Sequence, residues 1–164
     1  MRWFRIPVAY VRTLIATFKY PEHMSIKQRQ KAIELIMKLA KLYGLDTSVS
    51  DRCHLSPESI SQVAQARGVY RIYEETELQY IGASGTDIQW RLKRHYYESR
   101  NIHKARNKGL ADLIASGRAS LEWYVCPFAG WMEEYELTEY CQKHGRQPAL
   151  NSHRRSGLIN RSCW

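Results

Sequence analysis

The sequence lacks any apolar stretch approaching the length of a membrane span, and its first residues lack the long apolar segment and small-residue cleavage site of a signal peptide. Its four cysteines, Cys53, Cys126, Cys141 and Cys163, form no C-x-x-C pair. These absences argue against a membrane protein, a secreted disulfide framework and a zinc site with paired ligands. We therefore expect a cytoplasmic protein with free, mostly buried thiols.

Acidic residues are scarce in two parts of the chain, whose formal net charge is +9. Between Arg91 and Lys108 only Glu98 opposes the basic side chains, and the segment after Gly145 contains four arginines and no acid. Clustered positive charge attracts polyanions and releases counterions when it meets phosphates. Beside Arg91, the basic side chains of the first cluster are Lys93, Arg94, Arg100, Lys104, Arg106 and Lys108. This pattern favours nucleic acid as a partner, although a solvated basic surface also explains it.

The length of 164 residues, with 44% hydrophobic and 25% charged, suits one folded domain with an appendage. We expect an N-terminal helical extension over residues 1–66, where no strand pattern is present. A mixed strand and helix pattern then defines a domain over residues 67–152. Residues 153–164 form a basic tail.

The extension contains two predicted helices. A capping box begins a helix over residues 25–43, whose apolar positions form a stripe at helical spacing. Residues 45–55 are predicted to form a loop. Ser56 and Pro57 then supply the cap and first position of a short helix that ends near Ala66. Such a pair resembles a helix-turn-helix, but a packing appendage explains it equally simply and is the favoured interpretation.

From Gly68 onward the pattern indicates strands and longer helices. β-branched and aromatic residues alternate around a polar turn at residues 74–77, which predicts a β-hairpin. Thr86 or Asp87 can cap the helix that follows. The predicted strands cover residues 69–73, 78–81 and 119–126, and the predicted helices cover residues 86–100, 110–117 and 131–144. This order predicts an α+β fold with helices packed on an antiparallel sheet.

The hairpin carries the first candidate site residues. Hydrolysis of a phosphodiester needs a positioned water, stabilisation of negative charge on phosphorus and assistance to the leaving oxygen, usually from a metal. Tyr70 and Tyr80 offer hydroxyl groups, and Gly68 and Gly82 permit a close backbone approach. Tyrosines are also good strand residues and glycines commonly punctuate turns, so either motif alone has an ordinary structural explanation.

Two helices carry further candidates. Arg91 and His95 lie four residues apart, so they share a helix face from which a phosphate could be reached. The helix over residues 131–144 holds an acidic cluster within the basic domain, which consists of Glu133, Glu134, Glu136 and Glu139. Glu133 lies closest to the apolar stripe of that helix, where a carboxylate needs a reason such as a metal ion. Glu134 and Glu136 flank the stripe.

These elements, in this order, resemble the GIY-YIG nuclease superfamily. The resemblance covers residues 68–151, about half of the chain, and the ordered set is more specific than any of its pieces. The matching pieces are Gly68-Val69-Tyr70, Tyr80-Ile81-Gly82, Arg91 to His95, a glutamate on the last helix, and Pro148-Ala149-Leu150-Asn151.

The resemblance implies a small three-stranded antiparallel sheet flanked by helices. It also implies one divalent metal, Mg²⁺ or Mn²⁺, held by a glutamate. We prefer Glu133 for this role because apolar residues follow it at the family's positions. Glu136 is the alternate, and Glu134 stays open.

The resemblance also assigns roles to the other residues. Tyr70 or Tyr80 would position or deprotonate the attacking water, and Arg91 would stabilise the phosphate charge. His95 matches a histidine that some members carry, and Asn151 would brace the site. The spacing from Tyr80 to Arg91 is one residue longer than in the family. Unless the intervening loop absorbs that residue, Arg94 replaces Arg91 as the candidate.

The function implied is a metal-dependent DNA endonuclease that acts on double-stranded or branched DNA. Specificity would come from residues 1–66, from a homodimer or from a partner protein. The alternative is a DNA-binding module or regulator on an inactive nuclease fold, which would use its N-terminal helices to bind.

Overall fold

The computed structural model describes two continuous segments, residues 48–126 and 128–151, and six residues of the N-terminal part, namely Gln28, Lys31, Ala32, Glu34, Leu35 and Lys38. All six are helical, in agreement with the helix predicted over residues 25–43. The other positions of its apolar stripe, the aromatic and basic segment over residues 1–20 and the basic tail over residues 153–164 lie outside the described residues.

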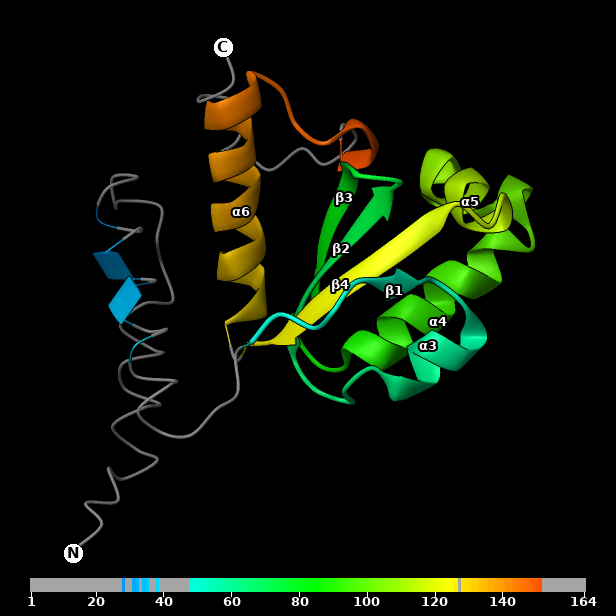
Figure 1. The fold of residues 1–164 in the computed structure, drawn as a ribbon, viewed down its shortest axis with the longest axis horizontal. Helices are drawn as coiled ribbons and strands as arrows, with labels where there is room; N and C mark the ends of the chain where they lie inside the picture. The colour runs from blue at the N-terminus through cyan, green and yellow to red at the C-terminus, as the bar shows by residue number, and fades with distance from the viewer. Residues whose placement is uncertain are drawn as a thin grey trace, which may run out of the picture.

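The centre of the fold is a four-stranded antiparallel sheet (Figure 1). Its strands are β1 (Cys53–His54), β2 (Gly68–Glu74), β3 (Glu77–Ser84) and β4 (Ala119–Val125), in the spatial order β1-β4-β2-β3. The prediction of three strands was wrong by one, because β1 lies in the segment predicted to be a loop. A strand of two residues leaves no periodic pattern, and β1 exists only through its pairing with the distant β4.

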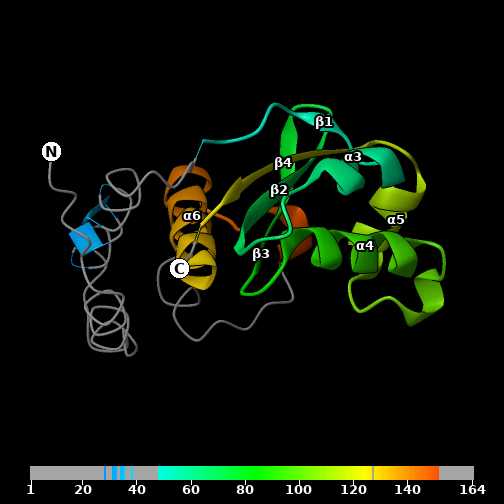
Figure 2. The ribbon, with the colours of Figure 1, turned by 90° about the horizontal axis from the view of Figure 1, so that it is seen from below.

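Helices cover both faces of the sheet. The helices of the two continuous segments are α3 (Pro57–Gln62), α4 (Ile88–Ser99), α5 (Lys108–Ala115) and α6 (Ala129–His144), with short 3₁₀ helices η2 (Ile102–Lys104) and η3 (Ala149–Asn151). Helix α6 lies against one face, while α3, α4 and α5 lie on the other (Figures 1 and 2). The architecture is therefore α+β, as the order of elements predicts.

Two hydrophobic cores flank the sheet, and β2 contributes to both. Tyr70 and Ile72 pack with residues of α4 and α5, whereas Val69 packs with residues of α6. Leu55 and Ile60, from the predicted extension, belong to the first of these cores. The segment from β1 to α3 therefore shares its core with the sheet.

Local signals explain most element boundaries. The side chain of Asp87, rather than Thr86, caps α4 by accepting a hydrogen bond from the backbone nitrogen of Trp90 at 3.0 Å. Gly145 ends α6 with a φ of 68°, a left-handed conformation that suits glycine. The hairpin turn is shorter than predicted, since both strands extend into residues 74–77. Its Glu75 takes a φ of 52°.

Helix α3 ends at Gln62, before the predicted end near Ala66. The next residue, Val63, is extended and buried in the core. The side-chain amide of Gln89 on α4 donates hydrogen bonds to the backbone carbonyls of Ser61 and Val63, at 2.9 and 3.2 Å. The end of α3 is therefore set by its contacts with α4 and the core, and not by a helix-ending residue in its own sequence.

The described cysteines agree only in part with the expectation of free thiols. Cys53 and Cys126 are free, and burial raises the pKa of the Cys126 thiol. Cys141 is disulfide-bonded, so the prediction of a free thiol was wrong there. Across the described part of the chain, no helix combines the length and apolar character that crossing a membrane requires.

Candidate active site

The two candidate tyrosines lie on one face of the hairpin formed by β2 and β3. Tyr70 stands opposite Gly82, and Tyr80 stands opposite Ile72. The ring centroids of Tyr70 and Tyr80 are 6.2 Å apart. A Cβ atom on Gly82 would lie 2.5 Å from Cζ of Tyr70 and 2.7 Å from Cε1 of Tyr80. The absence of a side chain at Gly82 therefore lets the Tyr70 ring lie across β3 and beside Tyr80.

We expect Gly82→Ala to lower the free energy of unfolding by roughly 1–3 kcal/mol, because its methyl group must displace two buried rings in a close-packed core. Gly85→Ala is the matched control, since a Cβ atom at Gly85 meets nothing within 4 Å. Urea unfolding of the two variants measures the difference. Equal stability of both would contradict the steric role of Gly82.

Gly68 allows close packing of the backbone at the start of β2. A Cβ atom there would lie 2.2 Å from the backbone oxygen of Tyr124 and 2.4 Å from Cδ1 of Ile88. The glycine thus permits β2 to approach both β4 and the start of α4 closely. Gly68 thereby helps to set the position of α4 relative to the sheet. The position of α4 in turn determines where its residues Arg91 and His95 lie.

Helix α4 brings His95 and Arg91 to the tyrosines. The hydroxyl of Tyr70 and Nε2 of His95 form a hydrogen bond of 2.8 Å, and both residues are buried. The rings of Tyr80 and His95 meet edge-on, with centroids 5.9 Å apart. Arg91 Nε is buried without a hydrogen-bond partner among the described residues. A buried guanidinium nitrogen with unused donor capacity is suited to an anionic ligand.

The electrostatics link these groups. Burial raises the pKa of Tyr70 well above its ordinary value, Tyr80 and Glu133 add to the rise, and Arg91 opposes it. Burial alone would lower the pKa of Arg91, but its interactions with Tyr70 and Tyr80 raise it. Tyr70 is therefore a neutral phenol at physiological pH, and Arg91 is a permanent cation beside it.

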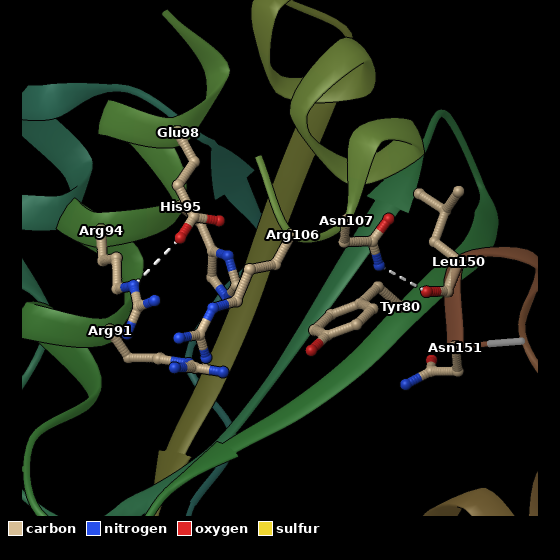
Figure 3. A pocket seen from close by; sticks show the side chains of 9 residues that line it. All are labelled: Tyr80, Arg91, Arg94, His95, Glu98, Arg106, Asn107, Leu150 and Asn151. Carbon is tan, nitrogen blue, oxygen red and sulfur yellow. Dashed lines mark hydrogen bonds and ion pairs between the residues drawn. The ribbon is translucent and has the colours of Figure 1, made fainter. Parts of the chain in front are cut away.

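A pocket with a volume of about 190 Å³ opens beside this cluster (Figure 3). Its lining residues are Tyr80, Arg91, Arg94, His95, Glu98, Arg106, Asn107, Leu150 and Asn151. The guanidinium groups of Arg91, Arg94 and Arg106 converge on the same space, which the Tyr80 hydroxyl also faces (Figure 3). Tyr70 and Glu133 do not line this pocket. Tyr70 is buried and is hydrogen-bonded to His95, which does line the pocket.

Asn151 is held at the edge of the sheet. Its side-chain oxygen accepts a hydrogen bond from the backbone nitrogen of Ile81, and its side-chain nitrogen donates to the carbonyl of Ile81, both at 2.8 Å. It is 1% exposed. Ile81 lies between Tyr80 and Gly82 on β3, so Asn151 fixes the backbone that carries Tyr80.

Asn107 was not among the predicted site residues. Its side-chain oxygen caps α5 by accepting a hydrogen bond from Leu110, and its amide donates to the carbonyl of Leu150 at 2.7 Å. It therefore ties the start of α5 to the segment that carries Asn151. An asparagine directly before a helix is a recognisable cap signal, but its second contact depends on the tertiary fold.

Arg106 was predicted only as a DNA contact on the basic surface. The structure places it in the pocket with Arg91 (Figure 3). It precedes α5, whereas Arg91 lies on α4, so the sequence gives no sign that the two guanidinium groups meet.

The structure separates the candidate glutamates. Glu136 forms a two-point ion pair with Arg71, with both nitrogen–oxygen distances at 2.8 Å, and accepts a hydrogen bond from the Tyr124 hydroxyl at 2.5 Å. Hydrogen bonding with Glu136 raises the pKa of Arg71. Glu133 is 8% exposed and raises the pKa of Tyr70. Glu134, which follows Glu133 directly in the sequence, is half-buried. Glu136 therefore serves a structural network, while Glu133 acts on the tyrosine cluster.

The loop between β3 and α4 lies in the segment from Tyr80 to Arg91, where the resemblance predicts one extra residue. Gly85 is exposed and faces open space, and the Ser84 hydroxyl accepts a hydrogen bond from the Asp87 backbone at 3.0 Å. This loop therefore has room for an extra residue at the surface. Arg91 reaches the pocket beside Tyr80, and Arg94 lines it as well.

The predicted DNA-contacting residues fall into three groups. Lys93, Arg94 and Lys104 line a second pocket on the outer face of α4, and Arg94 and Arg106 line the first. Arg100 lies over the Tyr96 ring, at 5.2 Å from its centroid. Lys108 is exposed at the start of α5. Arg100 and Lys108 line neither pocket.

The arrangement as a whole combines a cation-rich cavity, a buried tyrosine–histidine pair and a buried carboxylate on α6 that raises the pKa of Tyr70. Among the described residues, no group of three or more histidine, cysteine, aspartate or glutamate side chains could hold a metal ion. Comparison of the chain with models of protein families, with curated proteins and with solved structures finds no match.

Proposed function

We propose that this chain is a metal-dependent DNA endonuclease of the GIY-YIG type. One observation carries the proposal: Tyr80 of β3, Arg91 and His95 of α4 and Asn151 of η3 line a single pocket at the edge of the sheet. These are four of the residues to which the resemblance assigns roles in the site. The surrounding basic surface and the net charge of +9 suit a polyanionic substrate.

The pocket has the electrostatics that phosphodiester hydrolysis requires. The transition state carries extra negative charge on the oxygens around phosphorus, and preorganised cations in a water-poor site stabilise it. Arg91 supplies a cation whose buried Nε has capacity to donate. Arg106 and Arg94 add positive charge to the same space. We assign the scissile phosphate to the side of the pocket where these three guanidinium groups converge.

The two tyrosines take different roles in this proposal. Tyr80 lines the pocket and can contact a water beside the phosphate, so we assign it to the attacking water. Tyr70 is fully buried, is hydrogen-bonded to His95 and has a raised pKa. A phenol that keeps its proton is a poor base, so Tyr70 positions His95 and the edge of Tyr80 instead.

Glu133 is the proposed metal ligand. Mg²⁺ is commonly held by only one or two protein carboxylates, with waters and substrate phosphates completing its oxygen shell. A single buried carboxylate that acts electrostatically on Tyr70 fits that pattern, and a three-ligand protein cage is not required. When bound, the ion would supply Lewis-acid stabilisation of the phosphate and the leaving oxygen. Mn²⁺ accepts the same oxygen ligands.

Cleavage of supercoiled plasmid in Mg²⁺ or Mn²⁺ tests the proposal. We expect the protein to nick the plasmid, and Tyr80→Phe to slow nicking by roughly 10²-fold or more, the usual range for loss of an acid–base group. Tyr140→Phe, which removes a hydroxyl on α6 outside the pocket, should cut at the wild-type rate. A wild-type protein that binds DNA but never nicks it would favour the alternative of a binding module on an inactive nuclease fold.

A further inference from the structure

The outer face of α4 carries two large aromatic side chains that point into solvent. Trp90 is 56% exposed and Tyr97 is 69% exposed. They lie seven residues apart, which places them on one side of the helix and roughly 10 Å apart along its axis. Aromatic rings of this size are usually buried in a hydrophobic core or in an interface with a partner. We call this surface the Trp90–Tyr97 patch.

Basic side chains surround the two rings. Lys93, Arg94 and Lys104 line the same pocket as Trp90 and Tyr97, and the pocket has a volume of about 500 Å³. Of the described residues that line it, Glu98 is the only acid, and its carboxylate is paired with Arg94 at 3.0 Å. The patch therefore combines aromatic faces with an excess of positive charge.

The patch adjoins the candidate active site. Arg94 and Glu98 line both pockets, so the aromatic surface borders the pocket to which we assign the scissile phosphate. The Arg94 guanidinium also lies 6.0 Å from the centroid of the Trp90 ring. A nucleic acid strand leaving the proposed cleavage position along α4 would therefore meet lysine and arginine side chains together with two exposed ring faces.

We propose that the Trp90–Tyr97 patch binds unpaired nucleotides next to the cleavage position, so that the substrate carries a single-stranded segment there. This inference rests on the proposed function and specifies its substrate class. In a duplex the base faces are stacked inside and cannot meet an exposed ring. In an unpaired strand each base can stack on an aromatic side chain while lysine and arginine follow the phosphates. The separation of the two residues along the helix axis, roughly 10 Å, corresponds to about three stacked base steps of ~3.4 Å.

A second copy of the chain is the other simple occupant, and the charges disfavour it. Two copies meeting through this surface would bring Lys93, Arg94 and Lys104 of one copy against the same residues of the other, because a two-fold contact is made by one patch with itself. Only Glu98 could compensate, and it is already paired. The charge pattern therefore favours a polyanion.

The test is DNA binding in EDTA, where metal-dependent cleavage cannot proceed. Fluorescence anisotropy would compare a blunt duplex, the same duplex with a ten-nucleotide overhang, and a thymidine homopolymer. We expect Trp90→Ala with Tyr97→Ala to weaken binding of the two unpaired DNAs by about 5- to 150-fold for each stacked base, and to leave the blunt duplex unchanged. Tyr140→Ala, which removes an aromatic ring on α6, is the matched control.

Two further variants separate stacking from charge. Trp90→Phe keeps a ring and should retain most of the preference for unpaired DNA. Lys93→Ala with Lys104→Ala should weaken all three DNAs alike and reduce the salt dependence of binding. Equal losses on duplex and unpaired DNA in the aromatic double variant, or a change in its oligomeric state by size exclusion, would overturn the inference.

Failure of this inference and failure of the proposed function give different results. A wild-type protein that shows the preference for unpaired DNA but never cuts in Mg²⁺ or Mn²⁺ would support the patch and remove the nuclease proposal. If the wild-type protein nicks DNA but the aromatic double variant binds every DNA as the wild type does, only the proposal for the Trp90–Tyr97 patch is rejected.

Discussion

Glu133→Gln should reduce DNA cleavage in Mg²⁺ by roughly 10²–10³-fold or more, because a lost metal ligand forfeits several kcal/mol of transition-state stabilisation. The substitution changes one oxygen to nitrogen and keeps the size of the side chain. Its carboxylate is buried on α6 and acts electrostatically on Tyr70. Initial nicking rates across a Mg²⁺ titration would show the loss and whether higher metal concentration offsets it.

Two glutamates on the same helix control for this result. Glu139 is exposed, and Glu139→Gln should cut at the wild-type rate. Glu136 holds Arg71 and Tyr124, so Glu136→Gln should lower thermal stability. Full metal-dependent activity in Glu133→Gln, together with loss of activity in a folded Glu136→Gln, would move the metal to Glu136 and contradict our assignment.

Arg91→Ala should lower the cleavage rate by about 10²–10³-fold, the range seen when one preorganised group that stabilises transition-state charge is removed. Arg91 is the pocket guanidinium with a buried nitrogen lacking a partner among the described residues, and it is coupled to both tyrosines. Binding of DNA should change much less than the rate, since many other cations contact the polyanion. Single-turnover cleavage and anisotropy in EDTA separate the two quantities.

Arg91→Lys and Arg118→Ala sharpen that experiment. Lysine keeps the charge but loses the forked donor geometry, so Arg91→Lys should recover only part of the rate. Arg118 is exposed and pairs with Glu74 away from the pocket, so its removal should leave cleavage intact. If Arg91→Ala instead weakened binding and rate by the same factor, Arg91 would be a general DNA contact rather than a group that stabilises the transition state.

Local signals in the sequence predict much of this fold. Asp87 before α4 and Gly145 after α6 act as caps in the structure, as their positions indicate. The alternation of inward and outward side chains in β2 and β3 follows from the geometry of neighbouring residues, and so does the shared helix face of Arg91 and His95. Such short-range patterns can be recognised in a single sequence. The same geometry places Glu133 on the buried side of α6.

The features that sequence reasoning missed depend on contacts between distant segments. β1 is defined by its pairing with β4, and α3 ends where Gln89 of α4 meets its last carbonyls. The place of Arg106 in the pocket and the bond from Asn107 to Leu150 need α4, α5 and η3 to be packed first. No spacing rule within one segment carries that information.

The hydrogen bonds between Asn151 and Ile81 also have a consequence for assembly. β3 is the edge of the described sheet, and an edge strand is a template on which another chain can add a strand. Asn151 occupies both backbone groups of Ile81 in the middle of that edge. Strand addition along β3 by a second copy would have to displace η3 and, with it, the segment that braces Tyr80. Asn151, which holds the backbone of the candidate site in place, thus also blocks edge-to-edge aggregation of the sheet at β3.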